Sequence, residues 1–449
     1  MKLASHIPQL LATAALVGSL SAQAADLDRP QLIGWALLPA ATFADGPTSG
    51  QFAAPNPYGT HLPPYANRQP VQGFSGILRG TGRDSFHMLV DNGFGGRANS
   101  ADALLRMYAV SVDFRTRQGG AGTVQAADWT SGRAVPGFGE RTRITLNDAN
   151  HQLGLPIQAD NLHYYGNPAR PMVDAAIRSG RLLTGADLDI ESVRRDKRGN
   201  YWFGDEFGPY LVKTDAQGTV LRNAIPLPGV FAPENIEVAR GAAVANLGGS
   251  GGFEGMAIDA SGSRLYTLLE KTVAGDPART LRINEFDLTS EAYTGVVYFY
   301  PLDAGGTAIG DMTAIDDERF VVIERNGATT TSAPTAGVPF KKLFLIDLSG
   351  VASGGVVTKT ELVDLMNLSD PDDLDRDGKI VYTMPYVTIE NVLLQDARTL
   401  IVVNDNNFPY GGGRAASSDN TEFIRIRLPV SLGSRAGKRG SERDDRDDH

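Results

Sequence analysis

The 449-residue sequence contains no cysteine, which excludes disulfide bonds, thiolate-bound zinc and cysteine nucleophiles. It also lacks the basic excess of a nucleic-acid-binding protein, since it has 42 Lys and Arg residues and 52 Asp and Glu residues. Beyond the N-terminus no apolar run reaches the roughly 18 residues of a transmembrane helix, and no P-loop or H-E-x-x-H motif is present. Hydrophobic residues make up 42% of the chain, which is enough for a sizeable core.

The first 24 residues have the features of a secretory signal. Lys2 gives a positive start, residues 10–20 form a short apolar run, and Ala22-Gln23-Ala24 resembles a cleavage site. We therefore expect cleavage near Ala24, a periplasmic or extracellular location and no membrane anchor; an uncleaved N-terminal anchor is the alternative. Residues 433–449 are rich in both charges and have no large apolar residue, so they are predicted to be a disordered tail. Residues 25–432 then form one domain.

A repeat within this domain predicts its fold. Residues 253–271 and 310–325 align with Glu254 opposite Asp311, and similar segments lie at 189–206, 389–405 and, more loosely, 74–91. Each segment reads as a strand, a polar turn and a second strand that ends near an acid, and a third strand usually follows. Such units are typical of a β-propeller.

We therefore predict an all-β propeller of five or six blades, in which a strand at 32–38 closes the ring by pairing with the last unit. A sixth blade would have to come from residues 115–188. One inserted helix is expected within 171–183, where Val173, Ile177 and Leu182 share a face. Two stacked sandwiches are the rival architecture, but they would not explain the recurrence of acids at matching positions.

In a propeller the first strand of each blade lines a central channel, so matching residues converge there. The acids of the first strands are Glu191, Glu254, Asp311 and Glu390, with Ser75 in the fifth copy. The acids at the ends of the second strands are Asp91, Glu206, Glu270, Glu324 and Asp405. Converging carboxylates repel one another unless a cation neutralises them, and oxygen ligands suit Ca²⁺ or another hard divalent cation. The alternative is that these acids are solvated turn residues.

Basic residues stand beside two of these acids. Lys271 follows Glu270, and Arg325 follows Glu324. Acids that hold a metal beside cations would form a site for phosphate, in which Arg325 and Lys271 bind phosphate oxygens and Glu254 or Glu191 orients the attacking water. Surface salt bridges are the alternative interpretation of the same pairs.

A second acidic run lies at 370–378. Asp373, Asp375 and Asp377 precede Gly378 in a D-x-D-x-D-G pattern, which resembles the first half of a calcium loop. The twelfth position is Met384 rather than Glu, which argues against an EF-hand. The run predicts a simple calcium-binding turn, or else a polar loop stabilised by Asp side chains.

Several blocks of the sequence resemble the phytase-like family described as having esterase-like activity of phytase, found in secreted bacterial proteins. They are GFSGI (73–77), DNGFG (91–95), DIESV (189–193), GNYWFGDEFGPYL (199–211), GFEGMAI (252–258), DMTAID (311–316), VVIERNG (321–327), DPDDLDRDGK (370–379) and IENVLLQDARTLIVVNDNNFPY (389–410). The resemblance implies a propeller-like fold and a phosphoesterase-type activity. Its motif acids and amides here are Glu191, Asp205, Glu206, Glu254, Asp311, Glu324, Asn404, Asp405 and Asn406.

These observations lead to three hypotheses on function. The first is an exported, metal-dependent phosphoric-ester hydrolase of phytase-like type, whose partner is phytate or another small phosphorylated molecule. The second is a propeller of the cell envelope that binds a ligand or partner without chemistry, because a propeller fold alone does not define an activity. The third is a metal-dependent hydrolase of carboxylic esters or lactones. Nucleic acid is not an expected partner, and the oligomeric state is left open.

Overall fold

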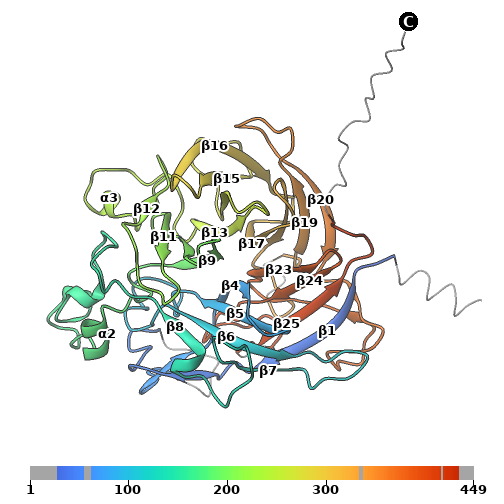
Figure 1. The fold of residues 1–449 in the computed structure, drawn as a ribbon, viewed down its shortest axis with the longest axis horizontal. Coiled ribbons are helices and arrows are strands. Elements are labelled where there is room, and N and C mark those ends of the chain that lie inside the picture. The colour runs from blue at the N-terminus through green and yellow to red at the C-terminus, as the bar shows by residue number, and fades with distance from the viewer. Residues whose placement is uncertain (1–27, 55–61, 333–336, 416–417, 434–449) are drawn as a thin grey trace, which may run out of the picture.

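The computed structural model describes residues 28–54, 62–332, 337–415 and 418–433 (Figure 1). The predicted signal at 1–24 and all but the first residue of the predicted tail at 433–449 lie outside these ranges. No helix in the described ranges is long and apolar enough to cross a membrane.

Five sets of mainly antiparallel strands surround a common axis (Figure 1). The first set is β4 (Phe74–Arg79), β5 (Ser85–Val90), β6 (Arg106–Asp113), β7 (Thr123–Ala126) and β8 (Arg143–Thr145). The second is β9 (Ile190–Arg195), β10 (Tyr201–Asp205), β11 (Tyr210–Thr214) and β12 (Ile225–Pro226). The third is β13 (Phe253–Ile258), β14 (Arg264–Leu269), β15 (Thr280–Asp287) and β16 (Ala292–Pro301). The fourth is β17 (Ala308–Ala314), β18 (Arg319–Arg325), β19 (Lys341–Asp347) and β20 (Thr358–Asp364). The fifth is β23 (Asn391–Asp396), β24 (Thr399–Val403), β25 (Thr421–Arg427) and β1 (Gln31–Leu38).

The first strand of each set lies next to the axis. These strands contact one another in a closed series, in the order β4, β9, β13, β17, β23 and back to β4. The backbone of β17 approaches the start of β23 so closely that position 310 requires glycine: a Cβ added to Gly310 would lie 1.9 Å from the carbonyl oxygen of Ile389. The predicted all-β propeller is therefore confirmed, with its first strands lining the axis.

The N-terminal strand closes the ring, as predicted. β1 pairs antiparallel with β25, from Gln31 opposite Arg427 to Leu38 opposite Thr421. β1 also makes single parallel pairings with β7, through Leu37 and Thr123, and with the short strand β21 (Leu368–Ser369), through Gln31 and Ser369. β21 continues antiparallel to β22 (Val381–Tyr382). β1 therefore joins the first and last sets to one another.

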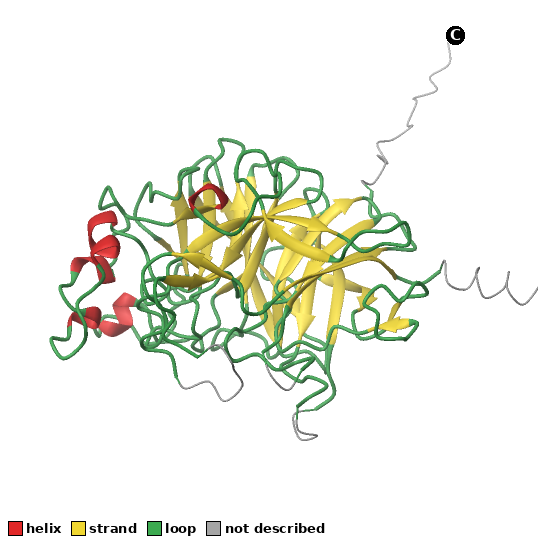
Figure 2. Cartoon of the chain, turned by 90° about the horizontal axis from the view of Figure 1, so that it is seen from below, coloured by secondary structure: helices red, strands yellow, loops and turns green. Residues whose placement is uncertain are grey.

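The segment between the first two sets builds no separate sheet in the part of the chain that the structure describes. β7 and β8 both pair with β6, and the rest of 115–189 is loops, 3₁₀ turns and the short helix α2 (Ala175–Gly180). α2 begins where Asp174 accepts a hydrogen bond from the backbone N–H of Ala176, and its Ile177 is buried. The expected helix within 171–183 is thus present but shorter. Figure 2 shows most of the helical segments gathered at one side of the strand region.

The remaining elements are small. They are β2 (Phe43–Asp45), which pairs with β3 (Arg68–Pro70), the helix α3 (Ile236–Ala239), and the 3₁₀ turns Glu140–Thr142, Gln158–Asp160 and Tyr164–Gly166.

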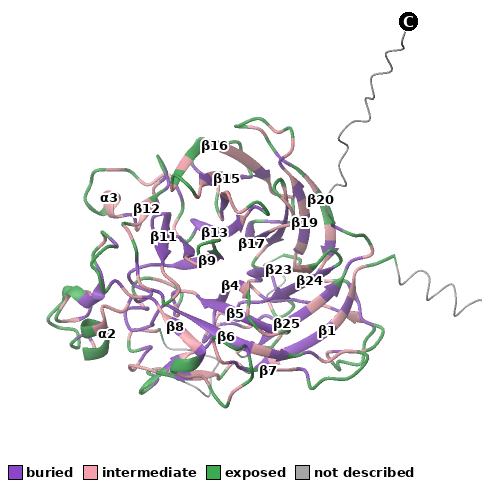
Figure 3. Ribbon diagram, in the orientation of Figure 1, coloured by how far each residue is buried: buried purple, intermediate pink, exposed green. Residues whose placement is uncertain are grey.

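The core lies between neighbouring sets of strands. The apolar residues of β13, β14 and β15 pack against those of β17 and β18, for example Ala257 and Leu268 with Ile309 and Met312. The second strand of each set is buried over almost its whole length, whereas the outer strands β16 and β20 consist mostly of intermediate and exposed residues (Figure 3). Polar residues on the inner strands therefore need partners within the protein or a ligand.

Candidate metal and phosphate site

Acidic side chains gather at one end of the axis. In an antiparallel hairpin the start of the first strand lies beside the end of the second, as Phe253 lies opposite Leu269 in the pair β13–β14. The five sets therefore bring the starts of all first strands and the ends of all second strands to one end of the ring. The buried acids at or next to these strand ends are Asp189, Glu191, Glu206, Glu254, Glu390 and Asp405. Asp91 and Glu270, at the corresponding ends, are half-buried.

Arg325, the last residue of β18, is the buried cation of this cluster. Its Nη2 lies 3.0 Å from Oε1 of Glu254, 3.1 Å from Oε1 of Glu270 and 3.1 Å from Oε1 of Glu390. The second oxygen of Glu390, Oε2, accepts a hydrogen bond of 3.0 Å from the Ser75 hydroxyl. One guanidinium thus connects the third, fourth and fifth sets of strands at the axis.

A second group of acids at the same end of the axis has the arrangement of a cation site. Asp189, Glu191 and Glu206 are buried, and each offers a carboxylate oxygen within 4.8 Å of the other two. Oδ1 of Asp189 and Oε1 of Glu206 are buried and have no hydrogen-bond partner among the described residues. Buried carboxylate oxygens without partners are unfavourable in the protein alone and suit a hard divalent cation. The donor set therefore fits the predicted cofactor.

Asp205 holds this group in place. Its Oδ1 accepts a 2.8 Å hydrogen bond from the backbone N–H of Asp189, and its Oδ2 accepts one of 2.8 Å from Gly208. The backbone N–H of Glu206 donates to the carbonyl of Asp189 over 2.9 Å. Asp205 therefore fixes the positions of two candidate ligands while its own oxygens are already bonded.

Burial and mutual repulsion raise the pKa values of the clustered acids. Burial, followed by repulsion from Asp405, raises the pKa of Glu390 to about 8. Burial raises the pKa of Asp405 to about 7, and the charge of Asp91 adds to the increase. The pKa values of Glu191, Glu206 and Glu254 are also raised, mainly by burial and then by neighbouring carboxylates. A bound cation would relieve this repulsion, because it favours the charged carboxylates.

Two lysines lie near the cluster. Lys271 is half-exposed at its rim; its Nζ lies 3.9 Å from Oε2 of Glu270 and donates a hydrogen bond to the Gly249 carbonyl. Lys341, which the sequence analysis missed, is buried on β19 beside Arg325. Burial, together with the charge of Arg325, lowers the pKa of Lys341 to about 6, and its Nζ donates to the Val387 carbonyl over 3.0 Å.

Two predicted metal ligands are bonded elsewhere. Glu324 points away from Arg325, because successive side chains of a strand face opposite sides, and it accepts hydrogen bonds of 2.6 Å from the Tyr300 hydroxyl and 2.8 Å from the Asp303 backbone. Asp311 forms a buried ion pair of 2.8 Å with Arg194, and the backbone N–H groups of Met312 and Val392 donate to its two oxygens. Both acids therefore have partners within the protein.

The amides of the resembling motif also have structural partners. The side-chain oxygen of Asn404 accepts a 2.7 Å hydrogen bond from the Glu422 backbone, and the side-chain nitrogen of Asn406 donates to the carbonyl of Asp419 over 3.0 Å. These contacts fix the segment after β24, which carries Asp405.

The acidic run at 370–378 lies in the loop between β21 and β22. Asp373 and Asp375 come together with Asp370, and their carboxylate oxygens lie within 4.8 Å of one another. Asp377, in contrast, forms a 2.6 Å ion pair with Lys379.

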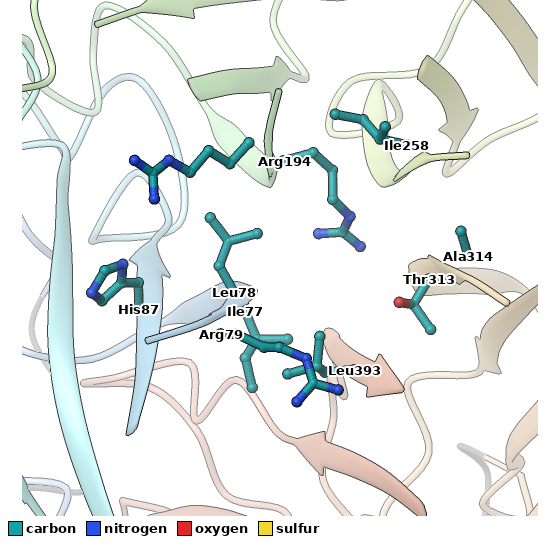
Figure 4. A pocket seen from close by; sticks show the side chains of 10 residues that line it. Ile77, Leu78, Arg79, His87, Arg194, Ile258, Thr313, Ala314 and Leu393 are labelled. Atoms are coloured by element: carbon teal, nitrogen blue, oxygen red, sulfur yellow. The ribbon is translucent and has the colours of Figure 1, made fainter. Parts of the chain in front are cut away.

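The opposite end of the axis is different in character. A cavity of about 320 Å³ is lined there by the last residues of the first strands, including Arg79, Arg195 and Ile258 (Figure 4). Arg194 reaches from this cavity to Asp311. His87 of β5 also lines the cavity and stacks on Trp129, with ring centroids 3.8 Å apart and planes at 7°. The two ends of the axis therefore differ, one acidic and one lined by arginines.

The fold and the acidic cluster define a propeller with a candidate metal site at one end of its axis. The family model described as "Esterase-like activity of phytase" matches residues 69–408, and the chain belongs to this phytase-like family. That range contains every residue of the acidic cluster.

A curated relative, an "Uncharacterized secreted protein" of the fungus Arthroderma benhamiae, is 28% identical over 181 residues. The match covers 34% of this chain and only 35% of that protein's length. The family model thus confirms the predicted phytase-like family. The relative is fungal, so it does not confirm the expected bacterial source.

Solved structures share only a weak overall likeness. The luciferin-regenerating enzyme has a TM-score of 0.35 at 9% identity, covering 89% of this chain and 97% of its own. The Malassezia sympodialis allergen Mala s 1 has a TM-score of 0.35 at 11% identity, and the match covers 82% of each chain. The exo-β-1,3-galactanase of Phanerochaete chrysosporium has a TM-score of 0.36 at 11% identity, and the match covers 84% of this chain and 63% of the galactanase chain.

Proposed function

We propose that this chain is an exported, metal-dependent phosphoric-ester hydrolase that acts on phytate or another small phosphorylated molecule. The observation that carries the proposal is the group of buried acids around Asp189 and Glu206, whose unpartnered oxygens lie in the same cluster as Arg325. Membership of the phytase-like family supports hydrolysis, and the acidic cluster supports metal dependence.

The candidate cation ligands are Asp189, Glu191 and Glu206, with Ca²⁺ as the proposed ion because all donors are carboxylate oxygens. A bound divalent cation would offset the charge of a phosphate group and lower the pKa of a bound water. Asp205 keeps Asp189 in position through the backbone hydrogen bond described above. Glu390, Asp405 and Asp91 add negative charge around the site and so increase its affinity for the cation.

The other side chains have separate roles in the proposal. Glu254 orients the attacking water and accepts its proton, since it lies in the cluster and its carboxylate is held by Arg325. Arg325 is a positioning residue, because its Nη2 is already shared by three glutamates. Lys271 binds a phosphate oxygen, because it is the half-exposed cation at the rim of the cluster.

Export is part of the proposal on two grounds. The sequence begins with the features of a secretory signal, and the curated relative is described as secreted.

The test is phosphate release from phytate and from simple phosphate monoesters, by protein treated with chelator and then given Ca²⁺. Glu206→Gln should lose the calcium-dependent rate, whereas Glu237→Gln, a half-exposed acid on α3, should keep it. Hydrolysis of carboxylic esters or lactones with no phosphate release would favour the third hypothesis. Calcium binding without turnover of any ester would favour a binding propeller and would contradict the proposed activity.

A further inference from the structure

The loop between β21 and β22 holds a second, separate group of carboxylates. Asp370 is completely buried, Asp373 and Asp375 are half-buried, and each offers a carboxylate oxygen within 4.8 Å of the other two. The backbone of the loop curls around this point, with positive φ angles at Asp373 and Arg376.

Each of the three carboxylates has one oxygen bonded to the backbone of the loop. Oδ2 of Asp370 accepts from the N–H of Leu374 over 2.8 Å. Oδ1 of Asp373 accepts from Gly378 over 3.0 Å, and Oδ1 of Asp375 accepts from Asp377 over 3.3 Å. These bonds orient the side chains and leave the second oxygen of each carboxylate for another partner.

The second carboxylate oxygen of Asp370, Oδ1, is the atom that points to a bound ligand. Oδ1 of Asp370 is buried and has no hydrogen-bond partner within the described ranges. A buried carboxylate oxygen without a partner is energetically unfavourable. A cation bound to this oxygen, beside the carboxylates of Asp373 and Asp375, would remove this cost, whereas exposed solvated acids would not create it.

We propose that Asp370, Asp373 and Asp375 bind a Ca²⁺ ion, independently of the candidate site at the axis and of any activity there. Three carboxylates provide part of the six to eight oxygens that Ca²⁺ takes, and water or backbone carbonyls complete the set. These three ligands are not the three expected from the D-x-D-x-D-G run. Asp370 is the third ligand in place of Asp377, because the carboxylate of Asp377 is paired with Lys379.

The position of the loop gives the bound ion a structural role. β21 ends at Ser369, directly before Asp370, and Ser369 pairs with Gln31 at the start of β1. The backbone N–H of Asp370 also donates to the carbonyl of Ile380 over 2.8 Å. The ion would therefore order the segment that holds the beginning of the closing strand.

A second connection leads from the loop to the same strand. Nη1 of Arg115 donates to the Leu374 carbonyl over 2.8 Å, and the backbone of Arg115 exchanges two hydrogen bonds with Trp35 of β1. Ca²⁺ in this loop would thus stabilise the ring closure in a protein that has no disulfide bonds.

The experiment measures calcium stoichiometry of the full chain by isothermal titration calorimetry. Asp370→Asn and Asp375→Asn should each bind one Ca²⁺ fewer than the unchanged protein. Asp375 is half-exposed and so less essential for folding than Asp370. Asp377→Asn is the matched control in the same loop and should keep the full stoichiometry. Glu206→Gln, at the axis, should keep the loop ion, so failure of the axial proposal and failure of this one are distinguishable.

Hydrogen exchange tests the structural role. Ca²⁺ should slow amide exchange in β1 and β25 by about tenfold or more in the unchanged protein and in Glu206→Gln, but not in Asp375→Asn. Unchanged stoichiometry in both Asp370→Asn and Asp375→Asn would overturn the site. Unchanged exchange in β1 on addition of Ca²⁺ would overturn its role in ring closure.

Discussion

Nη2 of Arg325 lies 3.0 Å from Oε1 of Glu254, and both side chains are buried next to the axis of the propeller. The same nitrogen also contacts Glu270 of the third set of strands and Glu390 of the fifth. One cation therefore compensates three carboxylates from two sheets that are not its own. Asp189, Glu191 and Glu206 form no ion pair with a basic side chain in the described ranges, which is why they are the candidate metal ligands.

Replacing Arg325 with methionine should destabilise the protein strongly. The change leaves Glu254, Glu270 and Glu390 without their shared cation, and breaking a buried pair costs about 3–5 kcal/mol. The measurement is the free energy of unfolding in urea without added metal. The control is Arg240→Met, which removes an exposed pair with Glu237 and should cost less than about 1 kcal/mol. Equal losses in the two variants would contradict the compensating role of Arg325.

Calcium binding should distinguish two buried acids near the axis, Asp189 and Asp311. Asp189→Asn should remove one bound Ca²⁺ by calorimetry, because Asp189 has an unpartnered buried oxygen in the candidate site. Asp311→Asn should lower the melting temperature but leave the stoichiometry unchanged, because Asp311 is already paired with Arg194. Loss of an ion in Asp311→Asn, with none lost in Asp189→Asn, would reverse this assignment.

Lys271→Ala should weaken substrate binding without affecting the fold. A charged hydrogen bond to phosphate contributes about 1.5–3 kcal/mol, which corresponds to an increase of about tenfold or more in KM for a phosphate ester. Steady-state kinetics and thermal unfolding provide the two readouts. Lys197→Ala, in the turn after β9 at the far end of that strand, should change neither. An unchanged KM in Lys271→Ala would remove this residue from the phosphate site.

His87 should make the protein less stable at acidic pH. Burial lowers its pKa to about 4 from 6.5, and the charge of Arg195 adds to the decrease. Because the unfolded chain then binds a proton at higher pH than the folded protein, stability falls as the pH decreases from about 6.5 towards 4. The loss attributable to His87 is about 2 kcal/mol at pH 4.5.

The matched variant for this effect is His87→Phe, which keeps an aromatic ring against Trp129. Its urea stability should fall less than that of the unchanged protein between pH 6.5 and 4.5. His151→Asn, at an exposed position whose positive φ suits asparagine, should behave like the unchanged protein. Identical pH profiles for all three proteins would show that His87 does not titrate in this range.

The repeat was sufficient to predict the fold and the end of the axis where acids gather. Strand–turn–strand units with acids at matching positions predicted the sets of strands, and the run at 32–38 predicted the closing strand β1. These features depend on local patterns, which the sequence displays directly. The length of α2 was overestimated, because the apolar face of 171–183 extends beyond the one turn and a half that is helical.

Which acids become candidate ligands depends on side-chain direction and on long-range contacts, which local sequence patterns do not contain. Asp189 was missed, although Asp187, Asp189 and Glu191 alternate and so face one side of an extended segment. Glu324 was aligned with Glu270, but the alternation along β18 places Arg325 in the cluster instead. The pairing of Asp311 with Arg194 joins residues 117 positions apart, and no local pattern predicts it.

The most direct test of the central claim is calcium-dependent phosphate release by the chelator-treated protein and its Glu206→Gln variant, measured on phytate. Ca²⁺ is expected to restore phosphate release in the unchanged protein, whereas the variant stays inactive although it still binds the ion of the Asp370 loop. Equal rates with and without Ca²⁺, or full activity in Glu206→Gln, would contradict a catalytic metal held by the carboxylates at the axis.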